Sequence, residues 1–223
     1  MSRSPLDTLL DAALPHVAFD GWSPATFCAA VAETGIDPAI CPRGAVDLAV
    51  AYHLRGDAAM AKAMAEADMS AMRYSEKVAY AIRLRLDAAE DKEIVRRGTS
   101  LFALPNHAAV GAKLIWGTAD AIWNALGDTS DDVNWYTKRA TLSAVYGSVV
   151  LFWLGDDAGG VDDFIDRRIE NVMQFEKVRA QVRGSALLKP LTGPLAAMMG
   201  AIKAPRRTAD PDLPGIWTKG SDT

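Results

Sequence analysis

The sequence is short of the residues that most metal sites and redox centres use. Its 223 residues include two cysteines, Cys28 and Cys41, which are too few for a disulfide framework or a cysteine-based zinc site. The three histidines, His16, His53 and His107, lie far apart and have no paired carboxylate motif. We therefore predict that the protein binds no metal ion.

Long apolar runs are also missing. The longest stretch without a charged residue, 140–155, has 16 residues, below the ~20 that a helix needs to cross a bilayer. The first seven residues contain no apolar region of the signal-peptide kind. Because half of the residues are hydrophobic and 23% are charged, a buried core is possible and global disorder is excluded. We expect a soluble, intracellular protein.

Catalytic motifs are absent as well. The sequence contains no G-x-S-x-G, C-x-x-C, P-loop or G-x-G-x-x-G pattern. The acidic pairs Asp156-Asp157 and Asp162-Asp163 lack the ligand spacing of a calcium loop, so helix capping is their expected role. We predict that the protein has no catalytic residues and is not an enzyme.

The net charge of -4 is unevenly distributed. Residues 174–207 contain seven basic residues and one acid, so acids dominate the rest of the chain. An acidic body with a short basic segment suits a protein whose C-terminal part meets an anionic surface. We divide the chain into a head at 1–56, a body at 57–173, the basic segment at 174–207 and a tail at 208–223.

The pattern of apolar residues predicts an all-α fold. Alanine recurs throughout, and alternating β-branched residues are scarce. Proline and glycine positions divide the chain into short helices in the head and longer ones in the body. The predicted elements cover residues 6–20, 24–34, 37–42, 44–54, 58–71, 75–89, 101–110, 113–126, 133–154 and 161–182.

The head has the outline of a helix-turn-helix, which favours comparison with one-component bacterial repressors. A recognition helix presents basic and amide side chains to DNA. The corresponding segment here, 36–43, instead holds two prolines, one Asp and one Arg, and the head has three basic residues against six acids. We predict that this head does not bind nucleic acid.

Two adjacent aromatic residues mark the start of the helix predicted at 133–154. Trp135 and Tyr136 lie about 100° apart on a helix, so at least one of them should be near the surface, beside Arg139 and an acidic loop. Exposed aromatic residues next to arginine are typical of interface hot spots. Burial of Trp135 with Tyr136 only partly exposed is the alternative, and the residues leave both open.

The basic segment carries an apolar arc of about 120° on a helical projection, with Lys189 and Lys203 outside it. Such a pattern is typical of a helix that lies in a membrane interface. Pro190 and Pro194 favour two short pieces over one continuous helix. The alternative is packing on the bundle or on a second copy. The apolar residues are Leu187, Leu188, Leu191, Leu195, Met198, Met199 and Ile202.

The residues around Trp135 resemble a known family. Residues 120–142, 152–157 and 164–169 are similar to the COQ9 family of coenzyme Q (ubiquinone) biosynthesis accessory proteins. The similarity extends weakly to 9–22 and 104–106. The segment Asn-Trp-Tyr-Thr-Lys-Arg-Ala, which begins at Asn134, is its most specific part.

The resemblance implies a TetR-repressor-like helical bundle that has lost DNA binding. It also implies a homodimer that binds lipids, including prenylated quinone intermediates, and supports the di-iron demethoxyubiquinone hydroxylase. The expected ligand is an isoprenoid or phospholipid, with no other cofactor. The residues assigned to hydroxylase binding are Ile122, Trp135, Tyr136 and Arg139, and those assigned to lipid binding are Phe102, Leu151 and Trp153.

The chain departs from the family in the shortened turn between Asp157 and Phe164, and in the two prolines of the basic segment. No transit peptide precedes residue 6, so we expect a bacterial member on the cytoplasmic side of the inner membrane. The sequence thus predicts a lipid-binding accessory factor that presents quinone intermediates to the hydroxylase. The alternative is a ligand-sensing TetR-type repressor.

Overall fold

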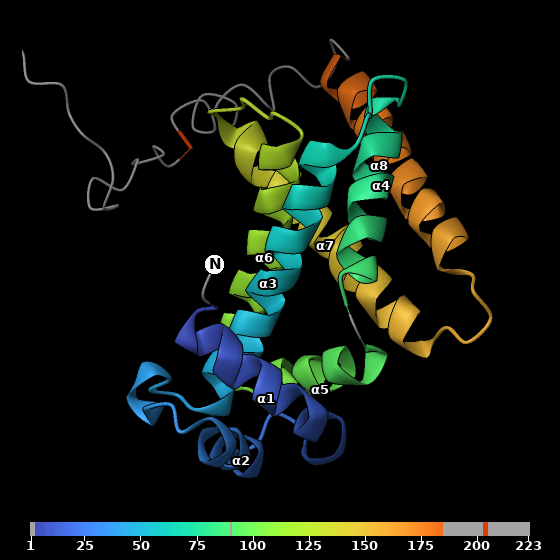
Figure 1. The fold of residues 1–223 in the computed structure, drawn as a ribbon. Helices are drawn as coiled ribbons and strands as arrows, with labels where there is room; N and C mark the ends of the chain where they lie inside the picture. The colour runs from blue at the N-terminus through green and yellow to red at the C-terminus, as the bar shows by residue number, and fades with distance from the viewer. Residues whose placement is uncertain (1–2, 90, 185–202, 205–223) are drawn as a thin grey trace, which may run out of the picture.

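The computed structural model describes residues 3–89, 91–184 and 203–204, with backbone alone at 175–184. Within these ranges the chain forms eight α-helices, one 3-10 turn and no strand, so the all-α prediction is confirmed (Figure 1). The elements are α1 (Pro5–Asp20), α2 (Pro24–Thr34), η1 (Pro38–Ile40), α3 (Ala45–Glu66), α4 (Tyr74–Asp87), α5 (Lys92–Ala103), α6 (Ala108–Ala125), α7 (Val133–Gly155) and α8 (Val161–Gly184).

The head is built from α1, α2, η1, the first half of α3 and α5. Ser4 and Ser23 cap the first two helices by accepting hydrogen bonds from the amides of Asp7 and Thr26. Gly35 ends α2 in the left-handed conformation, which glycine adopts without steric cost. These predicted boundaries are confirmed. The buried residues of the head are Leu9, Leu10, Ala13, Val17, Trp22, Ala30, Cys41, Ala45, Leu48, Ala49 and Ile94.

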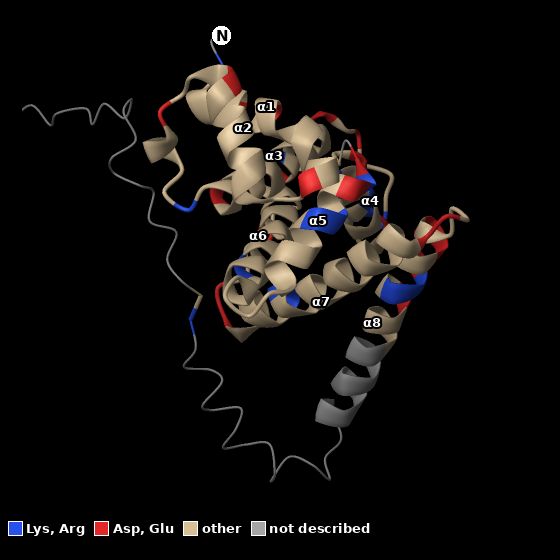
Figure 2. Ribbon diagram, turned by 90° about the horizontal axis from the view of Figure 1, so that it is seen from below, with Lys and Arg blue, Asp and Glu red and all other residues tan. Residues whose placement is uncertain are grey.

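The element between α2 and α3 is a single 3-10 turn, as the two prolines predicted. The Asp37 side chain accepts a hydrogen bond from the amide of Ala39 at 2.9 Å, and the turn ends at Cys41. The head therefore presents three residues of helix where a DNA-binding helix-turn-helix presents a recognition helix. In Figure 2 the ribbon of the head is coloured for Asp and Glu in several places and for Lys and Arg in few.

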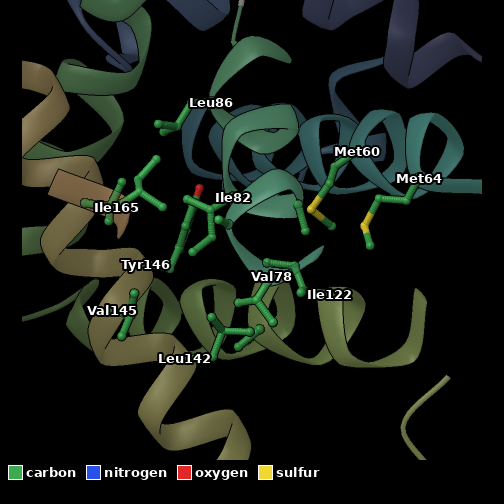
Figure 3. Close-up of a cluster of buried hydrophobic side chains, with 14 residues drawn as sticks. Met60, Met64, Val78, Ile82, Leu86, Ile122, Leu142, Val145, Tyr146 and Ile165 are labelled. Atoms are coloured by element: carbon green, nitrogen blue, oxygen red, sulfur yellow. The ribbon is translucent and has the colours of Figure 1, made fainter. Parts of the chain in front are cut away.

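The body packs the second half of α3, together with α4, α6, α7 and α8, around a second apolar cluster. Its side chains converge from all five helices, and ten of the fourteen are labelled in Figure 3. They fill the space between the helices, which is the packing expected of a protein core. The buried residues are Met60, Met64, Val78, Ala79, Ala81, Ile82, Leu86, Ala119, Ile122, Leu142, Val145, Tyr146, Val149 and Ile165.

One helix, α3, serves both clusters, and this differs from the prediction. We expected a break between two helices around Asp57, but α3 is continuous from Ala45 to Glu66. The reason is a buried ion pair, in which Arg85 Nε of α4 donates to Asp57 Oδ1 at 2.7 Å. Gly56 makes room for it, since a Cβ at that position would lie 2.5 Å from Arg85 Nη1. The residues that suggested a loop are therefore the contact between α3 and α4.

A polar network surrounds this ion pair. Thr118 of α6 donates its hydroxyl to Asp57 Oδ1 at 2.9 Å, and His53 Nε2 lies 2.8 Å from Thr118 Oγ1. Arg85 also donates to the main-chain oxygen of His53 at 3.0 Å. Burial, aided by the Arg85 charge, lowers the pKa of His53 to about 4, although Asp57 opposes the shift. His53 is therefore neutral near pH 7.

The helix α5 also departs from the prediction, which placed a buried segment at 101–110. The observed helix begins after its cap, Asp91, and ends before Leu104, which is exposed. Arg97 donates to the carbonyl of Ala18 near the end of α1, and Arg96 to that of Leu154 near the end of α7. Cations are favourable at helix C-termini, so α5 joins head to body through its basic residues.

Folding stability should fall in acid because of His53. A histidine whose pKa is lower in the folded protein contributes stability that is present above about pH 6.5 and lost as the pH falls towards 4. The total loss should be on the order of 2–4 kcal/mol. Urea unfolding gives the free energy of unfolding of the wild type and of His53→Gln between pH 4 and 7.5. The loss due to His53 is the extra decrease that the wild type shows over this range. His107→Gln is the control, and its free energy of unfolding should depend on pH as that of the wild type does. The same pH dependence in His53→Gln would contradict the prediction.

Candidate functional site

The strongest candidate site lies where the loop after α6 enters α7. Asp132 caps α7 by accepting a hydrogen bond from the amide of Asn134 at 2.8 Å. This fixes the first turn of the helix, which carries Trp135 and Tyr136. Tyr136 is 37% exposed and Trp135 is half-buried, with the two rings edge-to-face at 4.8 Å. We call this surface the Trp135–Tyr136 face.

Arg139 lies directly beneath this face and is fully buried. Its guanidinium carbon is 4.0 Å from the centroid of the Trp135 ring, within the range of a cation–π interaction. Its Nε donates to Asp120 of α6 at 2.5 Å, and its Nη1 donates to Asp128 of the loop at 3.1 Å. One arginine thus ties α6, the loop and the aromatic face together.

Asp128 is the acidic centre of this arrangement. Lys138 Nζ and the Ser130 hydroxyl donate to its Oδ1 at 2.6 and 2.8 Å, and Arg139 donates to its Oδ2. Burial raises the pKa of Asp128, but these three donors outweigh burial and bring the pKa down to about 2. The carboxylate therefore stays ionised and holds the loop in place.

Further aromatic rings surround the Trp135–Tyr136 face and Lys138. Trp116 of α6 lies 6.0 Å from Trp135, and Trp123 of α6 stacks on Tyr74 of α4 at 5.7 Å between centroids. Lys138 Nζ lies 5.4 Å from the Trp123 ring. These rings make the support of the face rigid, because aromatic side chains have few rotatable bonds.

Two of the four residues assigned to partner binding do not belong to the exposed surface. Ile122 is fully buried in the body cluster, and Arg139 is fully buried beneath Trp135. We expected Arg139 at the surface because it follows two aromatic residues and an acidic loop. It points inward instead, because the carboxylates of Asp120 and Asp128 pair with it there. Both residues position the face and do not contact solvent.

The three residues assigned to lipid binding are not brought together. Leu151 is 63% exposed on α7 and belongs to neither apolar cluster of the described chain. Phe102 packs against the head cluster, whereas Trp153 packs against the body cluster. Lys92 Nζ lies 5.2 Å from the centroid of the Trp153 ring. An apolar side chain in the sequence identifies neither its cluster nor its face, and lipid binding by these residues stays a prediction.

The residues assigned to membrane contact lie outside the described residues, with one exception. Lys203 is described and exposed, and together with Ala204 it lies beside the loop between α6 and α7. Among the residues that the structure describes, no helix combines the length and apolar character needed to cross a bilayer.

Two open grooves run along α8. The larger, of about 530 Å³, lies between α4 and α8, with Ala79, Ile169 and Met173 as its apolar side chains and a rim formed by Arg73, Ser75, Glu76, Asp166 and Glu170. The smaller, of about 370 Å³, is lined by Phe164, Arg167, Arg168, Glu170, Asn171 and Gln174. In the described part of the chain, no group of three or more His, Cys, Asp and Glu residues is placed to hold a metal ion.

The sequence did not identify Asp120, Asp128 and Lys138 as parts of the site. They lie within residues 120–142, which resemble the COQ9 family, but neither that resemblance nor the acidic loop before α7 assigned them a role. Asp132 does cap the helix, but Asp128 pairs with the two cations one turn into α7. Distinguishing these roles requires the position of α6, which the local sequence does not provide.

The Trp135–Tyr136 face lies in the part of the chain that is similar to a known family. The COQ9 family model matches residues 108–176, which contain α6, α7 and the first part of α8. The protein named "Ubiquinone biosynthesis protein COQ9, mitochondrial" is 33% identical in Rattus norvegicus and 32% identical in Homo sapiens, each over 102 residues. These matches cover 44% of this chain and about a third of each relative's length.

A longer match reaches into the head. The protein of the same name from Drosophila melanogaster is 25% identical over 187 residues, covering 79% of this chain and 57% of the relative. A TetR transcriptional regulator from Nitrosomonas europaea shares the fold, with a TM-score of 0.61 at 18% identity. That match covers 74% of this chain and 95% of the regulator. The predicted TetR-like fold and the resemblance to the COQ9 family are thus confirmed.

Removing the buried guanidinium should destabilise the protein strongly. Arg139→Met breaks the buried ion pair with Asp128 and also removes a partner of the partly exposed Asp120, and breaking a buried pair costs about 3–5 kcal/mol. Urea unfolding monitored by circular dichroism measures the change. Lys138→Met is the matched control, because the Lys138 side chain is 36% exposed and Arg139 still neutralises Asp128. Equal losses in the two variants would show that Arg139 does not hold the loop.

Proposed function

Residues 108–176 match the COQ9 family model, and from this premise we propose that the chain is a non-enzymatic accessory factor of ubiquinone biosynthesis. In this proposal it binds prenylated quinone intermediates at the membrane and presents them to the demethoxyubiquinone hydroxylase. The matched relatives carry ubiquinone biosynthesis in their names, which supports the pathway.

The observation that carries the proposal is the construction of the Trp135–Tyr136 face. Tyr136 is exposed, and the ring beside it is held by a buried arginine with two carboxylate partners. Interface hot spots are enriched in such tyrosine and tryptophan residues, and a rigid support lowers the entropy lost on binding. This surface is where we place the hydroxylase.

We place the isoprenoid chain in the groove between α4 and α8. Ala79, Ile169 and Met173 give it an apolar lining, and its volume of about 530 Å³ falls within the range of small-molecule sites. Its charged rim would stay in water or meet lipid headgroups. This groove is a different location from the one implied by Phe102, Leu151 and Trp153, which the structure does not bring together.

We assign membrane contact to the basic segment 174–207, whose seven basic residues suit anionic headgroups. The protein would then act as a homodimer that lies peripherally on a membrane. The names of the matched relatives describe them as mitochondrial, and in a bacterium the corresponding surface is the cytoplasmic face of the inner membrane.

A ligand-sensing repressor is the second candidate, because the fold is that of a TetR regulator. Two features of the head disfavour it. The turn η1 has three residues, and the head has three basic residues against six acids. The negatively charged DNA duplex would therefore meet a surface with a net negative charge. DNA affinity that falls steeply with salt would favour the repressor over the accessory factor.

Tyr136→Lys should abolish binding to the hydroxylase without unfolding the protein. The side chain is exposed, so a lysine there loses the aromatic contact and keeps the core intact. Binding of purified hydroxylase from the same organism is measured by calorimetry, together with the melting temperature. Phe19→Lys is the control, since Phe19 is 84% exposed on the head. Normal binding by Tyr136→Lys would place the hydroxylase elsewhere.

The purified full-length chain should carry an isoprenoid that mass spectrometry detects after extraction. Ile169→Asp, in the groove between α4 and α8, should reduce the bound lipid several-fold, because a charge would replace part of the apolar lining. The control is Phe164→Asp in the second groove, which should retain it. If both variants retained lipid equally, the lipid site would not be the groove between α4 and α8. A wild-type protein without bound lipid would contradict lipid binding.

A further inference from the structure

The described residues near the C-terminus contact the Trp135–Tyr136 face. The amide of Ala204 donates to the main-chain oxygen of Asp131 at 2.8 Å, and the Tyr136 hydroxyl donates to the main-chain oxygen of Lys203 at 3.4 Å. Figure 1 shows these two residues beside the loop between α6 and α7, far from the described end of α8. Two consecutive residues thus bind at the edge of the candidate site.

The contact uses groups that the face offers to any partner. Asp131 precedes the capping residue of α7, so its carbonyl is not used in the helix. The Tyr136 hydroxyl is the polar end of the exposed ring, and hot-spot tyrosines commonly use this group to bind partners. A protein that binds this face would have to displace the main chain of residues 203–204.

The charges on the two sides are opposite. Asp128 is neutralised by Lys138 and Arg139, but Asp131 and Asp132 are exposed on the loop. Lys203 is exposed beside them. In the sequence Arg206 and Arg207 follow at once. Attraction between exposed charges of this kind is weak and is screened by salt, so the contact is suited to being reversible.

We propose that Lys203 and Ala204 act as an internal ligand of the Trp135–Tyr136 face and compete with the hydroxylase for it. The inference rests on the proposed function of that face. The contact with the face and the contact with the membrane exclude each other in this proposal, because Lys203 belongs to the basic segment that we assign to the membrane. Anionic headgroups that attract Lys203 withdraw it from the acidic loop and leave the Tyr136 hydroxyl free. The face then opens to its partner at the membrane surface.

A proline at position 204 tests the competition directly. Ala204→Pro removes the amide that donates to Asp131, whereas Ala204→Ser keeps this amide and is the matched control. Without vesicles, the full-length Ala204→Pro chain should bind purified hydroxylase about 2- to 10-fold more tightly than the wild type and Ala204→Ser, the range that one hydrogen bond represents. Unchanged or weaker binding would overturn the competition.

A second measurement does not depend on the hydroxylase. In the full-length wild-type chain, the Ala204 amide should exchange with deuterium at least several-fold more slowly than an unprotected amide, because Asp131 accepts its hydrogen. Tyr136→Phe, which removes the second hydrogen bond, should speed that exchange. An unprotected Ala204 amide would overturn the contact itself. A protected amide in a protein that does not bind hydroxylase would instead contradict the proposed function of the face.

Lipid vesicles test whether an anionic membrane releases the contact. Vesicles rich in phosphatidylglycerol should raise hydroxylase affinity for the wild type towards that of Ala204→Pro, and vesicles of phosphatidylcholine alone should not. An equal effect of both vesicle types would overturn the electrostatic release.

Discussion

The buried ion pair between Asp57 and Arg85 determines how the rest of the molecule is arranged. It keeps α3 helical through Gly56, and one continuous helix therefore enters both apolar clusters. A buried guanidinium is stable only where its partners are fixed, and here they come from α3, with Thr118 of α6 binding the same carboxylate. The head and the body consequently form one packed unit around α3.

The helix α6 connects this ion pair to the candidate site. Thr118 binds the Asp57 carboxylate, and Asp120, two residues later, binds the buried Arg139. Between and after them, Ala119 and Ile122 belong to the body cluster. The rotation of α6 about its axis is therefore fixed by polar contacts on one side and by apolar packing on another. Since Arg139 stacks on Trp135, that rotation also sets the position of the Trp135–Tyr136 face.

Features that depend on neighbouring residues could be predicted from the sequence. The ends of α1 and α2 follow from serine caps and glycine stops, and the start of α7 follows from Asp132. The exposed aromatic residue at the candidate site was predicted in the same way. The continuity of α3 and the position of α5 could not be predicted, because they depend on Arg85 and on arginines that bind the ends of other helices. The inward direction of Arg139 likewise depends on Asp120, 19 residues away.

The same contacts explain why a protein that uses its body would keep its head. Arg97 of α5 binds the end of α1, Arg96 binds the end of α7, and Ile94 of the same helix is buried in the head cluster. Removing α1 and α2 would expose that cluster, including the first half of α3, and would remove the contact of α5 with α1. In the proposed accessory factor, which binds no DNA, the head is therefore retained because it completes the packing that holds α3 and α5. Those helices in turn hold α6 and the Trp135–Tyr136 face in position.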